Sequence, residues 1–189
     1  FSKVENSKRI QRMFSEQQFS TVTTPGMEHY LLPEYFPPPV RYLRQRIAMD
    51  EFSPVYPDSN STRPLLVHAT TSPNLKGTNF VKDAIERLAS KYDFEFRYME
   101  KMPRHDALKL MQKADIVIDQ LILGHHGFLA VEAMAFGKPV LCYIKPSILK
   151  DYPAEMPIVN ANPDTIYDEL EKLIINAQLR HDIGVKGRA

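Results

Sequence analysis

Short apolar runs alternate with amphipathic stretches from residue 64 to the C-terminus. The apolar runs predict strands at Leu65–Ala69, Phe94–Met99, Ile116–Ile118, Val140–Ile144 and Pro157–Asn160. Helical spacing of apolar residues predicts helices at Gly77–Ala89, Arg104–Lys113, Phe128–Phe136, Pro163–Asn176 and Ala177–Arg188. Strands that alternate with helices of this length favour right-handed β-α-β units. The fold class is therefore α/β, with a parallel sheet that carries helices on both faces.

The first third of the chain has a different pattern. Residues 5–18 favour a helix, and the β-rich run Phe19–Thr23 favours a short strand. From Pro25 to Pro64 the many prolines exclude long regular elements and predict an extended connection, and its aromatic residues indicate that it packs on a surface. We therefore expect residues 1–63 to be the end of one domain plus a linker, and residues 64–189 to be a second domain. Both ends of the chain lie in helix-like sequence, which suggests a piece of a longer protein.

Composition narrows the class of protein. The chain has 24 basic and 23 acidic residues, a formal net charge of +1, so bulk charge does not predict a nucleic-acid-binding protein. It has neither an apolar stretch of about 18 residues nor a secretory signal pattern. The single cysteine, Cys142, lies in an apolar run and is interpreted as a core residue. We expect a cytoplasmic protein.

Residues 115–143 form the strand–loop–helix–strand unit with the clearest chemistry. The loop Gly124-His125-His126-Gly127 precedes a helix whose first amides, those of Phe128, Leu129 and Ala130, could bind phosphate oxygens. Glu132, about one turn into the helix, could accept hydrogen bonds from a ribose diol. Asp119, at the carboxyl end of the strand, could also reach a ligand. The alternative is a plain turn followed by a solvated glutamate.

The segment from residue 70 to Gly77 is a second strand-to-helix loop. Hydroxyl side chains such as that of Ser72 could cap the helix, and the Lys76 ammonium suits a diphosphate. We expect Lys76 at the helix start, where it opposes the helix dipole, although a lone lysine can also be merely solvated. A P-loop pattern is absent. The histidines have no carboxylate or cysteine at a metal-ligand spacing, so His125 or His126 is interpreted as a polar wall of the site and no metal is expected.

Together these motifs resemble the C-terminal half of the family 4 ("group 1") glycosyltransferases. The matching segments are His68–Thr78, Ala114–Gln120 and above all Gly127–Val140, with its E-A-M-A-x-G-K-P-V pattern, while Val22–Pro54 resembles the interdomain crossover. Members of this family are retaining enzymes with two Rossmann-like domains, the GT-B architecture. The resemblance implies that residues 64–189 are the Rossmann-like donor domain and that residues 1–63 are a remnant of the N-terminal domain plus a Pro-rich crossover.

The resemblance also implies residue roles. Lys76 pairs with the diphosphate of a UDP-sugar or GDP-sugar, the amides after Gly127 hold that diphosphate, and Glu132 binds the ribose. Lys101 and Met102, in the loop that ends at Arg104, line the base. Lys76 and Glu132 are the expected catalytic residues, and transfer proceeds without a metal or other cofactor. The expected binding residues are Ser72, Lys76, Gly77, Lys101, Met102, Arg104, Asp119, Gln120, His125, His126, Gly127, Phe128, Leu129, Ala130 and Glu132.

Two positions depart from the family pattern. Gly124 stands where the family has a glutamate that contacts the donor sugar, so sugar recognition passes to Gln120, His125 or His126. A basic residue expected near the end of the first strand is replaced by His68-Ala69, so Lys76 acts alone or Arg104 compensates.

The resemblance also indicates partners. The acceptor, a glycan or a lipid-linked molecule, would bind the N-terminal domain that this chain almost entirely lacks, so we expect nucleotide binding without turnover. The full-length protein is expected at the inner membrane surface as a peripheral protein, without nucleic acid. Two alternatives remain open: a catalytically inactive relative that serves as an interaction or regulatory module, and a GT-B-type sugar-nucleotide epimerase.

Overall fold

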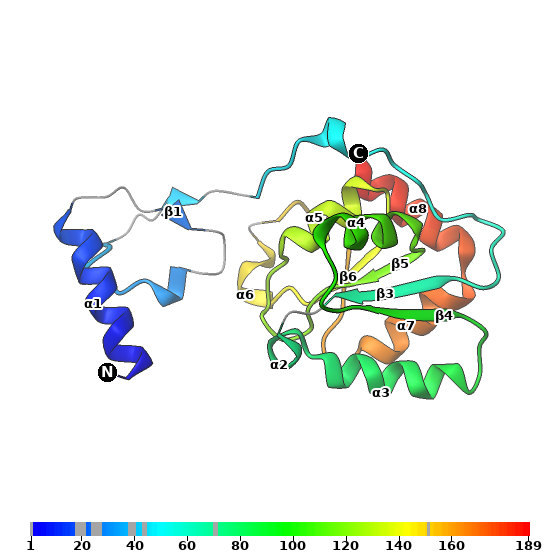
Figure 1. The fold of residues 1–189 in the computed structure, drawn as a ribbon, viewed down its shortest axis with the longest axis horizontal. Coiled ribbons are helices and arrows are strands. Elements are labelled where there is room, and N and C mark those ends of the chain that lie inside the picture. Colours follow the sequence, from blue (N-terminus) through cyan, green and yellow to red (C-terminus); the bar gives the residue numbers. More distant parts are fainter. Residues whose placement is uncertain are drawn as a thin grey trace. The chain divides into compact units, whose positions relative to one another are not determined.

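The computed structural model describes residues 2–17, 22–23, 28–37, 41–42, 45–69, 72–150 and 152–189. The chain forms two compact units, Phe1–Gln45 and Arg46–Ala189 (Figure 1). The second unit thus begins before residue 64, where we expected the donor domain to start. The reason is Phe52, which is buried and packs edge-on against the Phe136 ring with centroids 4.9 Å apart. The Val55 N–H also donates to the Phe136 carbonyl at 2.9 Å, so this part of the predicted linker belongs to the second unit.

The first unit contains one long helix and a small parallel pair of strands. Helix α1 (Lys3–Glu16) begins with a capping box in which the Ser2 hydroxyl and the Glu5 carboxylate each accept a backbone N–H. Strand β1 (Val22–Thr23) pairs with β2 (Arg41–Tyr42), and a 3-10 helix spans Glu28–Tyr30. The predicted N-terminal helix is present, whereas residues 18–21 of the two N-terminal predictions lie outside the described residues.

The second unit is built on a five-stranded, all-parallel sheet with strand order β4-β3-β5-β6-β7. Its strands are β3 (Leu65–Ala69), β4 (Glu95–Met99), β5 (Ile116–Ile118), β6 (Val140–Cys142) and β7 (Ile158–Asn160). Every residue of β5 and β6 is buried, which explains why their sequences are continuously apolar. The predicted α/β class and parallel sheet are confirmed.

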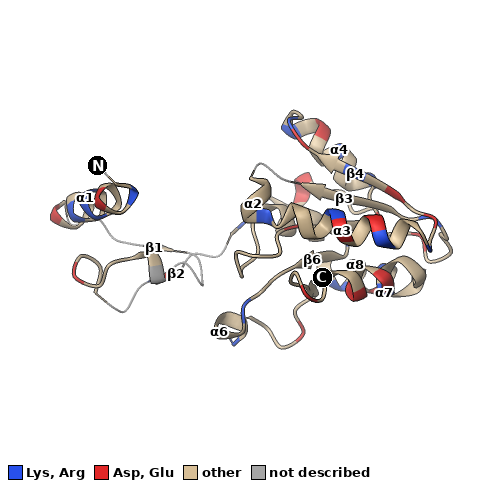
Figure 2. Ribbon diagram, turned by 90° about the horizontal axis from the view of Figure 1, so that it is seen from below, with Lys and Arg blue, Asp and Glu red and all other residues tan. Residues whose placement is uncertain are grey.

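Helices cover both faces of this sheet (Figure 1). Helices α4 (Arg104–Lys113) and α5 (Phe128–Ala135) pack on one face, and α3 (Thr78–Ala89) and α7 (Ile166–Ile175) pack on the other. Helix α8 (Ala177–Arg188) contacts both α5 and α7, and α6 (Pro146–Leu149) is a short turn after β6. The outer side of α3 carries charges of both signs (Figure 2), including the Lys82–Glu86 and Asp83–Arg87 pairs. None of the described helices has the length and apolar character of a membrane span.

Two predicted elements differ from the structure. The segment Pro73–Lys76, expected as a loop, forms the one-turn helix α2, with Pro73 in its first turn and Gly77 in the left-handed conformation behind it. Lys76 therefore ends α2 and directly precedes Gly77, the N-cap of α3, so its expected position at the start of the helix that follows is confirmed. Helix α7 begins at Ile166 and not near Pro163, because the Asn162 side chain accepts the N–H groups of Asp164 and Thr165 in a turn.

The side of the sheet on which the chain adds its next strand changes between β3 and β5. After β3 the chain builds β4 on one side, then returns to place β5 on the other side of β3. Such a switch point leaves a crevice at the carboxyl ends of the two strands, and open α/β sheets bind ligands there. The segments that follow β3 and β5 meet at this edge, where the Leu121 N–H donates to the Lys76 carbonyl at 3.1 Å.

Candidate functional site

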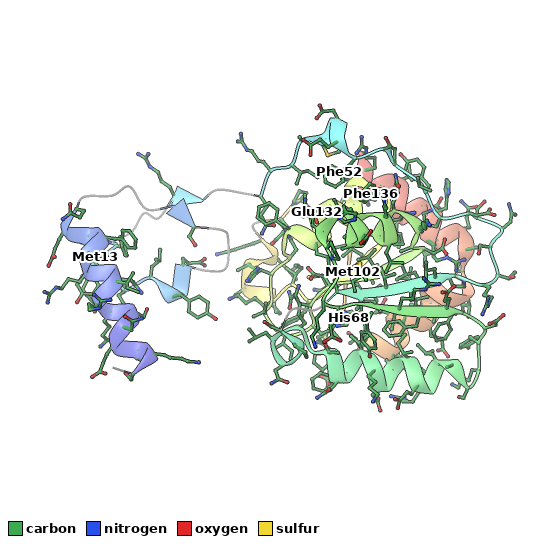
Figure 3. All side chains as sticks on the ribbon, in the orientation of Figure 1. Met13, Phe52, His68, Met102, Glu132 and Phe136 are labelled. Carbon is green, nitrogen blue, oxygen red and sulfur yellow. The ribbon has the colours of Figure 1, made fainter. Side chains whose placement is uncertain are left out.

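A pocket of about 350 Å³ opens beside the carboxyl ends of β3 and β4. Its volume lies within the range of about 300–1,000 Å³ that is usual for small-molecule sites. Most of its lining is apolar, and four charged residues, Lys76, Lys101, Arg104 and Glu132, also line it. Figure 3 shows Glu132 and Met102 on the side of the sheet that α4 and α5 cover. The lining residues are Ala69, Lys76, Met99, Lys101, Met102, Arg104, Ala107, Leu108, Met111, Leu129 and Glu132.

Lys76 reaches this pocket from the end of α2 and is paired with Asp119. Its Nζ donates to Oδ1 of Asp119, the first residue after β5. The Asp119 side chain is fully buried, while that of Lys76 retains 20% exposure. The Lys76 side chain therefore stays partly accessible and lines the pocket, whereas the Asp119 carboxylate is closed off from solvent. Ser72, the N-cap of α2, and Gly77, in the left-handed conformation between α2 and α3, form the ends of the turn that carries Lys76.

Gln120 organises the loop between β5 and α5. Its side-chain amide donates to the carbonyls of His125 and Tyr143, and its Oε1 accepts the N–H groups of Ile122 and Leu123. The residue is 1% exposed. The amide is thus engaged with backbone on both sides, and this geometry favours a role in shaping the loop over contact with a sugar.

The same loop places the start of α5 at the switch point, beside the end of β5. Gly127 is the N-cap, and its N–H donates to Asp119 Oδ2 at 3.2 Å. The next three N–H groups, those of Phe128, Leu129 and Ala130, cannot be paired within an α-helix, and a glycine cap offers no side chain to accept them. Together with the helix dipole, these amides favour an anionic ligand. The Phe128 side chain itself is 55% exposed.

Glu132 projects from α5 into the pocket and is paired with Arg104, the first residue of α4. Arg104 donates to Glu132 Oε1 at 2.5 Å. The glutamate side chain is 8% exposed and the arginine side chain 69%, so the arginine covers the carboxylate from the solvent side. Arg104 thus forms its ion pair with Glu132 and not with Asp119, the buried acid that binds Lys76.

The loop that connects β4 to α4 forms one rim of the pocket. Lys101 has a positive φ of 51°, an uncommon conformation for a residue with a side chain, and Met102 follows it. Both residues line the pocket. Their predicted contact with the base of a nucleotide stays a prediction.

The three histidines near the site have different surroundings. His68 is fully buried between the Ile118 carbonyl and the Thr78 hydroxyl, and burial lowers its pKa, so it is neutral at pH 7. It faces α3, on the side of the sheet away from Met102 (Figure 3). His125 and His126 are half-buried in the loop before α5, and each ring lies near the following residue's carbonyl. The described residues hold no cluster of three or more His, Cys, Asp or Glu side chains of the kind that binds a metal.

Burial also explains Cys142. Its thiol is fully buried next to Asp119 and Gln120, and burial raises the pKa of that thiol well above its usual value. The residue is therefore an inert core group, as predicted from its apolar run.

Sequence reasoning missed the apolar floor of the pocket. Met99, Met111, Ala107 and Leu108 line it, and the helical spacing of the last three only indicated that they point inward. Periodicity cannot separate a side chain that faces the core from one that faces a cavity. The ion pairs of Lys76 and Glu132 were equally hidden, because their partners lie 43 and 28 residues away along the chain.

A family model described as "Glycosyl transferases group 1" matches residues 75–189, which include α3 to α8 and the Lys76, Asp119 and Glu132 positions. The chain belongs to the group 1 glycosyl transferases. No curated protein sequence matches it.

Several solved structures share the fold of this chain. HepE from Anabaena, in complex with UDP and glucose, superposes with a TM-score of 0.66 at 15% identity, over 100% of this chain and 62% of that protein. TarM from S. aureus, in a complex that includes UDP, gives 0.66 at 15% identity over 97% of this chain and 42% of that protein. WaaG, a glycosyltransferase involved in lipopolysaccharide biosynthesis, gives 0.64 at 17% over 100% and 63%. The chain thus has a Rossmann-like fold of the GT-B type and spans less than two thirds of these relatives.

Proposed function

We propose that this chain is the donor-binding half of a retaining glycosyltransferase and that it binds the nucleoside diphosphate of a UDP-sugar or GDP-sugar. The observation that carries the proposal is the convergence of Lys76, Glu132 and the start of α5 at one pocket beside the switch point. The pocket takes the nucleoside, with the base against Met102 and the ribose diol on Glu132. The diphosphate lies against Lys76 and the amides of Phe128 to Ala130.

The chemistry follows from where negative charge develops. When the bond from the sugar to the diphosphate breaks, charge accumulates on the departing phosphate oxygens. The Lys76 ammonium and the amides at the N-terminus of α5 are oriented before the reaction and stabilise that charge. No metal or other cofactor is needed in this scheme. The acceptor, a glycan or lipid-linked molecule, binds the domain that completes the longer relatives, so the chain alone binds nucleotide without turnover.

Calorimetric titration with UDP, GDP and ADP tests this function. One of the three is expected to bind, and Lys76→Ala is expected to weaken its binding about 10-fold or more, the worth of a lost charge-assisted hydrogen bond. Lys82→Ala is the matched control, because that lysine lies exposed on the outer side of α3. No binding of any nucleotide by the wild-type chain would contradict the proposal.

The ribose contact has its own test. If Glu132 accepts hydrogen bonds from the diol, the wild-type chain discriminates between the ribonucleotide and its 2′-deoxy analogue, and Glu132→Gln reduces that discrimination. Glu86→Gln, an exposed change on α3, serves as the control. Equal discrimination by the wild-type and Glu132→Gln chains would remove Glu132 from the ribose site.

One observation favours a different function, that of an inactive relative acting as an interaction module. The charged side chains expected to meet ligand are already paired within the chain, Lys76 with Asp119 and Glu132 with Arg104. That alternative predicts a stable fold without nucleotide affinity, so the same titration separates the two.

A further inference from the structure

Asp119 joins the two groups to which the diphosphate is assigned. Its carboxylate is fully buried at the end of β5, and its two oxygens bind to different elements. Oδ1 accepts from the Lys76 ammonium on α2, and Oδ2 accepts from the Gly127 N–H at the start of α5. One rigid side chain therefore sets the position of an ammonium relative to a helix N-terminus.

The contact with Lys76 leaves that residue able to bind an anion. An ammonium has three N–H donors, and the described hydrogen bond to Asp119 uses one of them. The Lys76 side chain remains 20% exposed. A lysine without a partner samples many rotamers of its four-carbon stem, and fixing it on binding costs entropy. The buried carboxylate removes much of this freedom before a ligand arrives.

The contact with Gly127 fixes which amides face the ligand. Because the Gly127 N–H points to Asp119, the amides that remain for an external acceptor are those of Phe128, Leu129 and Ala130. The same bond holds Gly127, the N-cap of α5, against the end of β5. Gly127 has extended backbone, with φ of −103° and ψ of −176°, so this geometry does not depend on glycine flexibility.

We infer that Asp119 is a positioning residue that holds the Lys76 ammonium and the start of α5 at the spacing of one diphosphate. This inference rests on the proposed function. It makes a prediction opposite to that of simple electrostatics. Coulomb's law alone says that removing a negative charge beside an anion site tightens anion binding. Positioning says that Asp119→Asn weakens it, because the lysine and the helix start lose their common anchor.

The test titrates UDP, GDP and ADP into the wild-type chain and then the best-bound nucleotide and inorganic pyrophosphate into variants. Asp119→Asn is expected to weaken binding of the nucleotide about 10-fold, and Lys76→Met is expected to do the same. Because part of the effect of Asp119 passes through Lys76, the losses of affinity in the two single variants are expected to add up to more than the loss in the double variant. Asp115→Asn is the matched control, since this carboxylate accepts the Leu65 N–H at the opposite end of β5, and it is expected to leave affinity within about twofold.

A measurement on the wild-type chain covers the case in which Asp119→Asn does not fold. In ¹H–¹⁵N spectra with saturating nucleotide, the Gly127 amide keeps its bond to Asp119, and so its resonance moves less than those of Phe128, Leu129 and Ala130. A Gly127 resonance that moves most would overturn the inference.

The remaining outcomes separate the two proposals. A wild-type chain that binds none of the three nucleotides overturns the proposed function, and the positioning role fails with it. A wild-type chain that binds nucleotide, combined with Asp119→Asn binding that is unchanged or tighter, overturns the positioning role alone.

Discussion

The contact between Gly184 in α8 and Gly137 after α5 gives the sharpest stability prediction. A Cβ added at Gly184 would lie 2.2 Å from the Gly137 carbonyl oxygen and 3.1 Å from its carbonyl carbon. The Gly137 backbone cannot easily move away from the added Cβ, for three reasons. Its φ is +74°, its N–H donates to the Met134 carbonyl at 2.8 Å, and the Tyr56 ring occupies the space where its own Cβ would lie.

These distances set the expected magnitude. Replacing a helical glycine by alanine gains up to about 1 kcal/mol of helix propensity. Overpacking against backbone costs about 1–3 kcal/mol or more. At Gly184 the obstacle is a carbonyl oxygen at 2.2 Å, so the cost of overpacking lies at or above the top of that range. After the gain in helix propensity is subtracted, Gly184→Ala is expected to destabilise the second unit by about 2 kcal/mol.

Gly187→Ala is the matched control in the same helix. Its added Cβ meets the flexible Met134 side chain at 3.3 Å, so that variant is expected to lie within about 1 kcal/mol of the wild type. Urea unfolding followed by far-UV circular dichroism measures both changes as shifts in midpoint. Equal stability of the two variants would refute the close approach of α8 to the turn after α5.

Two further predictions concern glycines of the binding loop and a buried lysine. Gly127→Ala is expected to be tolerated, because its φ is −103° and the new Cβ meets only Asp119 Oδ2 at 3.6 Å, whereas Gly124→Ala (φ +82°, Cβ 3.0 Å from Lys145 Cβ) is expected to cost about 1–3 kcal/mol in the same unfolding assay. Burial lowers the pKa of Lys138 to about 8 in the folded chain. Between about pH 8 and the ordinary pKa of lysine, the unfolded chain therefore binds more protons than the folded chain, and this residue makes the free energy of unfolding rise with pH. Lys138→Met is therefore expected to be more stable than wild type at pH 7, by about 1 kcal/mol, with the difference shrinking toward pH 10, and a pH-independent difference would contradict this.

The sequence predicted best the elements that have a clear local hydrophobic pattern. The strands Leu65–Ala69 and Ile116–Ile118 and the helix Arg104–Lys113 have the predicted bounds, because continuous apolar runs and 3.6-residue spacing are local signals. The one-turn helix α2 escaped prediction because four residues are too few to show a period. The start of α7 was misjudged because side-chain hydrogen bonds of Asn162 form a turn that hydrophobicity does not report.

The candidate site, too, was predicted only in part. Motif spacing brought attention to Lys76, Glu132 and the start of α5, and the fold brings all three to one switch point. The partners that fix these groups depend on tertiary contacts. Asp119 and Gln120 were predicted to reach ligand, and the structure shows both buried and bonded to protein groups. No local pattern distinguishes a polar residue that meets a ligand from one that holds the residue that does.

A crystal structure of the chain with its best-bound nucleotide tests the central claim most directly. We predict the diphosphate oxygens within hydrogen-bond distance of Lys76 Nζ and of the Phe128, Leu129 and Ala130 amides, with the ribose on Glu132 and the base beside Met102. A nucleotide bound elsewhere, or one that reaches this pocket without contacting Lys76 or the start of α5, would contradict the account.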